Sequence, residues 1–124
     1  MTVLLVDDDA SVRMLMASAL TRQGFQVSAA SGAQEALDRF AALDGKVDVL
    51  VTDVMMPDMN GFDLARSLSM LNSSLPVVFV SGFCEAPLPS GESQSLDTAM
   101  HSVFVQKPFR IDEFLEAVGS VLVA

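Results

Sequence analysis

The sequence has little of several residue types, and each shortage excludes a class of protein. It contains one cysteine, Cys84, so no disulfide can form within the chain, which agrees with a reducing compartment. A single histidine, His101, leaves a zinc site without its usual ligands. No apolar run is long enough to cross a membrane, and no basic, cleavable leader follows Met1. We therefore expect a cytoplasmic protein that does not associate with membranes.

Basic residues are also scarce. The chain has 7 Lys and Arg against 16 Asp and Glu, which gives a formal net charge of -9 at pH 7. A domain this acidic should repel the phosphates of nucleic acids and of anionic lipids. We therefore expect no direct nucleic acid binding.

Apolar residues, in contrast, are plentiful enough for one core. Hydrophobic residues make up 51% of the 124 positions and charged residues 19%, which is typical of a packed globular protein and not of a disordered one. This length falls within the size range of one domain. We therefore expect residues 1–124 to form a single domain.

Short apolar runs alternate with segments of helical periodicity. The predicted strands cover residues 3–6, 25–29, 47–52, 76–80 and 103–106, and amphipathic helices are expected after the first, second, third and fifth strands. Asp9 is expected to cap the first helix, and Ser31 with Gln34 to form a capping box at the second. The segment 84–102 is rich in Ser and Pro, so a fourth helix there should be short or irregular.

Strands that alternate with helices indicate right-handed βαβ units. The predicted fold is therefore α/β and flavodoxin-like: a doubly wound, five-stranded parallel sheet in the order 2-1-3-4-5, with helices on both faces.

Polar residues occur where the predicted strands end. Asp7 and Asp8 follow the first strand, Asp53 the third, Ser81 the fourth and Lys107 the fifth. Parallel strands end at the same edge of a sheet, and ligands bind there at the point where the strand order reverses. Clustered carboxylates need a cation to neutralise them, and oxygen ligands favour Mg²⁺. The sequence therefore predicts a shallow, acidic magnesium site at this edge.

Such a site suits phosphoryl chemistry. Asp53 could act as a carboxylate nucleophile, because Mg²⁺ and Lys107 would offset its repulsion of an incoming phosphate. The hydroxyl of Ser81 could donate to a phosphoryl oxygen and complete the arrangement.

Four segments resemble the receiver domains of bacterial response regulators, in the family's order and over nearly the whole chain. They are VLLVDDD, VTDVMMPDMNG, VFVSGF and VFVQKPF. The resemblance implies a phosphorelay switch of partner binding, not an enzyme with a separate substrate. Asp53 would accept a phosphoryl group from a histidine kinase or a histidine phosphotransfer protein. The sequence does not identify the downstream effector.

The same resemblance assigns further roles. Asp8, Asp53 and the Met55 carbonyl would bind Mg²⁺, with Asp7 acting through water. Ser81 and Lys107 would respond to the phosphoryl group, and the peptide bond between Lys107 and Pro108 is commonly cis in this family.

Two features qualify the resemblance. Phe104 stands where many members carry a tyrosine whose rotation reports phosphorylation, so Ser81 and Phe104 are the expected switch residues. The segments SGF and QKPF resemble receivers attached to hybrid sensor kinases, and the domain is either a separate protein or part of a longer one.

Two other functions compete with this interpretation. The run Asp7 to Ser11 partly resembles the start of haloacid-dehalogenase-like phosphatases, although the chain has no room for a cap domain. A pseudo-receiver, which has the same fold but works unphosphorylated, is disfavoured because Asp8, Asp53, Ser81 and Lys107 are all present.

Overall fold

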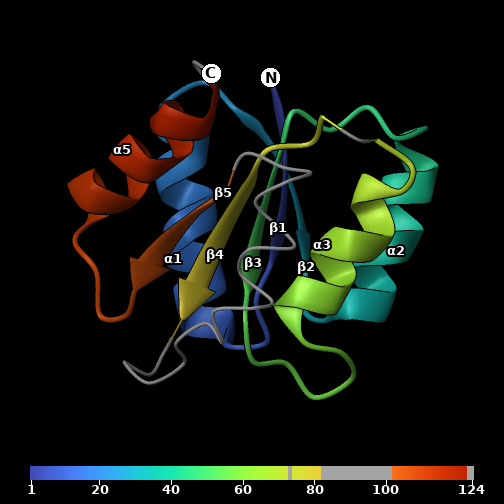
Figure 1. Cartoon of the computed structure of the whole chain (residues 1–124). Coiled ribbons are helices and arrows are strands. Elements are labelled where there is room, and N and C mark those ends of the chain that lie inside the picture. The colour runs from blue at the N-terminus through green and yellow to red at the C-terminus, as the bar shows by residue number, and fades with distance from the viewer. Residues whose placement is uncertain (73, 82–101, 123–124) are drawn as a thin grey trace.

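A computed structural model of the chain describes residues 1–72, 74–81 and 102–122 (Figure 1). The strands are β1 (Thr2–Val6), β2 (Gln26–Ala30), β3 (Val49–Asp53), β4 (Val77–Ser81) and β5 (Ser102–Gln106). The helices are α1 (Ala10–Arg22), α2 (Ala33–Ala42), α3 (Gly61–Ser69) and α5 (Ile111–Leu122). The predicted short or irregular fourth helix falls, except for Ser102, outside the described residues, as do Cys84 and His101.

The five strands form one parallel sheet in the order β2-β1-β3-β4-β5, which confirms the predicted topology. Helices α1 and α5 cover one face of the sheet, and α2 and α3 cover the other (Figure 1). The strand order reverses between β1 and β3, so their carboxyl ends lie side by side at the centre of one edge.

The core has two layers because the sheet is covered on both faces. In β1, Leu4 and Val6 pack on the side of α2 and α3, while Val3 and Leu5 pack on the side of α1 and α5. All four are fully buried, which explains why this strand is a continuous apolar run without polar alternation.

Two leucines that share the helical spacing of core residues are nevertheless exposed. Leu71 is 72% exposed because α3 ends at Ser69, so the helical spacing that would bury it is not continued. Leu15 is 49% exposed and lines an open hollow of about 400 Å³ together with Pro108 and Phe109.

The predicted caps were confirmed for α1 but not for α2. The side chain of Asp9 accepts hydrogen bonds from the amides of Ser11 and Val12, as expected. At α2 the capping box was wrong, because Gly32 is the N-cap residue. Ser31 instead donates to Glu35, through its amide and its hydroxyl, each at 2.9 Å.

Helix length and composition also bear on the membrane prediction. Among the described residues, no helix combines the length and the apolar character that crossing a bilayer requires.

Candidate functional site

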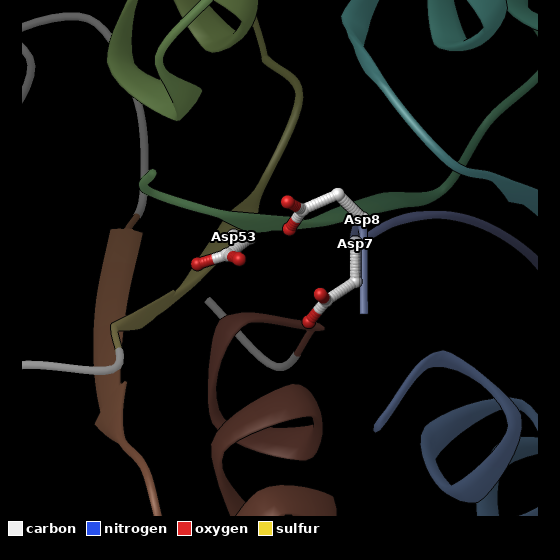
Figure 2. Close-up of side chains that lie close together, drawn as sticks. All are labelled: Asp7, Asp8 and Asp53. Atoms are coloured by element: carbon white, nitrogen blue, oxygen red, sulfur yellow. The ribbon is translucent and has the colours of Figure 1, made fainter. Parts of the chain in front are cut away.

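Three carboxylates meet at the sheet edge. Asp7 and Asp8 directly follow β1, and Asp53 is the last residue of β3. Figure 2 shows the side chains of Asp7 and Asp8 leaving adjacent backbone positions in different directions, with the Asp53 carboxyl group nearby. Each can offer a carboxylate oxygen that lies within 4.8 Å of the others. The neighbouring positions of β1 and β3 in the sheet produce this cluster.

Asp7 is held in one orientation by its surroundings. It is fully buried, and its Oδ1 accepts a hydrogen bond from the Asp9 amide at 2.8 Å. Its carbonyl accepts a second bond, at 2.7 Å, from the guanidinium group of Arg13 in α1. Its other carboxylate oxygen, Oδ2, has no directed hydrogen bond among the described residues, although Lys107 Nζ lies 3.1 Å away as an ion pair.

Sequence reasoning missed Arg13. A cation in the first turn of a helix is unfavourably placed relative to the helix dipole. Arg13 occupies that turn of α1, and this position was the available signal that its side chain has another partner. The guanidinium group holds the backbone of Asp7 in place and thereby helps to position Asp7 in the acidic cluster.

Asp53 is destabilised as a carboxylate when no metal is bound. It is 5% exposed, and this burial, followed by the negative charge of Asp7, raises its pKa from 3.8 to about 6. The ammonium group of Lys107, 3.5 Å from Asp53 Oδ2, opposes this shift. Burial also lowers the pKa of Lys107, but the charges of Asp7 and Asp53 outweigh it and raise the pKa overall.

The donor set fits an oxygen-preferring divalent cation. Lys107 supplies one positive charge to Asp7 and Asp53, while Asp8 adds a third carboxylate at the surface. One cation does not neutralise three carboxylates, and the buried Oδ2 of Asp7 still has a lone pair to offer. Met55, the other predicted ligand, lies two residues beyond Asp53, and its amide donates to Asp53 Oδ1 at 3.4 Å.

Ser81 and Phe104, the predicted switch residues, lie on the neighbouring strands β4 and β5. Ser81 ends β4, is 8% exposed, and its carbonyl accepts a hydrogen bond from the Lys107 amide at 2.7 Å. Phe104 on β5 is 41% exposed, and its ring stacks on Phe79 at a centroid distance of 5.0 Å. The peptide bond between Lys107 and Pro108 is cis, as the resemblance implied.

Helix α3 begins directly against the backbone of Asp53. The amide of Gly61 donates to the Val54 carbonyl at 2.8 Å. A Cβ atom at Gly61 would lie 2.3 Å from the Asp53 carbonyl oxygen, far inside van der Waals contact. Only glycine permits this approach, which closes the base of the loop that follows Asp53.

Comparison with known proteins agrees with this geometry. A family profile described as "Response regulator receiver domain" matches residues 3–119. The chain is 36% identical over 121 residues to the sensor kinase CckA of Brucella abortus, covering 98% of this chain and 12% of that protein. It is also 36% identical over 124 residues to the DNA-binding transcriptional regulator NtrC of Rhizobium meliloti, covering 98% and 24% respectively. The chain thus spans less than a quarter of either relative.

Solved structures give the same result. The receiver domain of the hybrid histidine kinase CckA superposes with a TM-score of 0.79 at 28% identity, covering 98% of this chain and 99% of that one. The response regulator protein TrrA of Thermotoga maritima, solved in complex with Mg²⁺-BeF, superposes with a TM-score of 0.80 at 25% identity, covering 98% of each chain. The phosphatase alternative has no support from these relatives.

Proposed function

The chain belongs to the response-regulator receiver domain family, and on this basis we propose that Asp53 carries a phosphoryl group in a phosphorelay. The observation behind this proposal is the cluster of Asp7, Asp8 and Asp53, with Lys107 in contact with two of the three carboxylates. Clusters of like charge in a buried setting are costly, so their presence indicates a functional site.

In the proposed reaction, a carboxylate oxygen of Asp53 attacks the phosphorus of a phosphohistidine. The phosphorus–nitrogen bond breaks and the imidazole of the donor leaves, so a partner with a phosphohistidine is required: a histidine kinase or a histidine phosphotransfer protein. Lys107, already 3.5 Å from Asp53 Oδ2, would pair with a phosphoryl oxygen and offset the added charge. The Ser81 hydroxyl would donate to another.

Mg²⁺ would be held by the carboxylates of Asp8 and Asp53 and by the Met55 carbonyl, with Asp7 acting through water. The ion supplies charge neutralisation for the attack of an anion on an anion. The related protein TrrA, whose structure contains Mg²⁺-BeF, supports this choice of metal.

The output of the domain would be a change in partner binding and not the turnover of a substrate. Ser81 and Phe104 are the proposed switch residues, and residues 1–124 the single domain that contains them. The net charge of -9 argues against direct contact with nucleic acid. The activities of CckA and NtrC do not identify the effector, because each is far longer than this chain.

Borohydride trapping tests the proposal. An acyl phosphate on Asp53 is reduced by borohydride to homoserine, so peptide mapping after treatment with acetyl phosphate and Mg²⁺ should locate homoserine at position 53. Conversion at another aspartate would contradict the assignment, and no conversion at all would favour the pseudo-receiver.

A further inference from the structure

The loop between β3 and α3, residues 54–60, is attached at its tip to another helix. Asp58 Oδ1 accepts a hydrogen bond from the Ala33 amide at 3.2 Å, and Asp58 Oδ2 accepts one from the Gln34 amide at 3.0 Å. These amides belong to the first two residues of α2. The bonds from Gln34 and then Ala33 lower the pKa of Asp58, so the side chain remains an acceptor at neutral pH.

Helix α2 depends on this distant carboxylate because it has no cap of its own. Its N-cap residue is Gly32, which has no side chain to bond the first amides. A Cβ atom on Gly32 would lie 3.2 Å from Asp58 Oδ2 and 3.3 Å from Oδ1. The Asp58 carboxylate therefore occupies the space in which a local cap would stand.

Two further hydrogen bonds hold the ends of the loop. The Gly61 amide bonds the Val54 carbonyl at 2.8 Å, and the Asn60 side chain accepts from the Asp63 amide at the start of α3. Between these ends, Met56 and Met59 are only partly buried against the core. Within the part of the chain that the structure describes, the two hydrogen bonds to Asp58 attach the tip of the loop to α2.

We propose that Asp58 is a positioning residue that holds the loop so that the Met55 carbonyl can reach the metal. This inference rests on the proposed function, which makes Met55 a ligand of Mg²⁺. A loop freed at its tip samples more conformations, so its carbonyl occupies the ligand position for less of the time. Loss of a helix-capping contact is worth a factor of roughly 3 to 30 in an equilibrium constant, so Mg²⁺ affinity should fall within that range in Asp58→Ala.

The experiment must distinguish the loss of the Asp58 charge from the loss of its hydrogen bonds to α2, because removing any nearby anion weakens the attraction of a cation. Asp63 provides a matched control: it lies at the start of α3, is exposed, and its carboxylate pairs with Arg66 at 3.6 Å. Asp63→Asn removes the same charge and leaves the tether intact, so it should change Mg²⁺ affinity by less than about twofold at physiological salt.

The experiment must also distinguish the loss of the α2 cap from the release of the loop. In the Asp58→Ala background, Gly32→Ser supplies a local cap in the space that the carboxylate has left. The backbone of Gly32 is extended, with φ -166° and ψ 177°, so serine fits without strain. This double variant should regain the stability of the helix but not the attachment of the loop.

Calorimetric titration with Mg²⁺ alone, together with urea unfolding of the metal-free proteins, tests the inference. We expect weaker Mg²⁺ binding in Asp58→Ala and equally weak binding in Asp58→Ala with Gly32→Ser, whose unfolding free energy returns toward that of the wild type. The double variant also keeps the measurement possible if the single variant does not fold.

Wild-type affinity in Asp58→Ala, or recovery of both affinity and stability in the double variant, would overturn the inference, because Asp58 would then be only a helix cap. If the wild-type protein itself binds no Mg²⁺, the proposed function fails, and the positioning role fails with it.

Discussion

Replacing Asp53 by asparagine should stabilise the metal-free protein at neutral pH. The side chain is almost completely buried beside Asp7, and its pKa is raised from 3.8 to about 6. Its charged form is therefore less favourable in the folded protein than in the unfolded chain. Asparagine has nearly the same shape and carries no charge, so it removes this penalty.

The size and the pH dependence of the effect follow from linkage. Because the folded pKa lies above the unfolded one, the penalty is absent below pH 4, develops as the pH rises to about 6, and is complete above that. The rise in the pKa of Asp53 corresponds to about 3 kcal/mol at most. Relaxation of the site reduces this penalty, so we expect Asp53→Asn to raise the free energy of unfolding by roughly 1–3 kcal/mol. At pH 3.5 the two proteins should be nearly equal in stability.

Urea unfolding at pH 3.5 and pH 7.5 in the presence of EDTA measures this difference. Asp44→Asn is the control, because Asp44 is an exposed residue in the turn before β3 and asparagine tolerates its positive φ of 57°. Addition of Mg²⁺ should reduce the difference in unfolding free energy between Asp53→Asn and the wild type, because Mg²⁺ stabilises only the wild type. A gain of equal size at both pH values, or no gain at pH 7.5, would refute the electrostatic reasoning.

Further substitutions test three features of the site and its surroundings. Gly61→Ala should destabilise the fold by about 2 kcal/mol or more, because its Cβ would meet the Asp53 carbonyl. Gly119→Ala, in an open position of α5, should instead stabilise the fold by about 0.5–1 kcal/mol. Urea unfolding that changed the free energy of unfolding in the same direction for both variants would contradict this. Lys107→Met should lower the free energy of unfolding by about 2 kcal/mol or more without metal, since buried Asp7 loses its cation. Mg²⁺ should restore part of this stability. Equal losses of stability with and without Mg²⁺ would argue that Mg²⁺ and Lys107 do not both neutralise the carboxylates. Met55→Asn should speed the loss of the phosphoryl group, because the exposed Met55 side chain has no polar group to orient water, whereas asparagine has. An unchanged decay rate of the phosphoprotein would exclude this.

The sheet and the acidic cluster could be predicted from the sequence because both depend on local patterns. An apolar run such as residues 3–6 indicates a strand buried on both faces, and the aspartates that end it must then lie at the sheet edge. The parallel topology places Asp53 beside Asp7 without further information. The cap at Asp9 is equally local, because acceptor and donors are two and three residues apart.

The contacts that escaped prediction depend on the tertiary structure. Asp58 caps a helix that begins 25 residues earlier in the chain, so no short motif identifies it. Ser31 and Gln34 satisfy the capping-box pattern, yet Glu35 competes successfully for Ser31, and the backbone bond and hydroxyl bond from Ser31 lower the pKa of Glu35 to about 2. Leu15 has the spacing of a core residue but lies at the edge of the buried face of α1.

Intact mass spectrometry after incubation with acetyl phosphate tests the central claim most directly. We expect the wild-type protein to gain the mass of one phosphoryl group in the presence of Mg²⁺, and to gain none after EDTA treatment or in Asp53→Asn. Modification of the Asp53→Asn variant at the wild-type rate, or modification that is insensitive to EDTA, would contradict the assignment of a Mg²⁺-dependent acyl phosphate to Asp53.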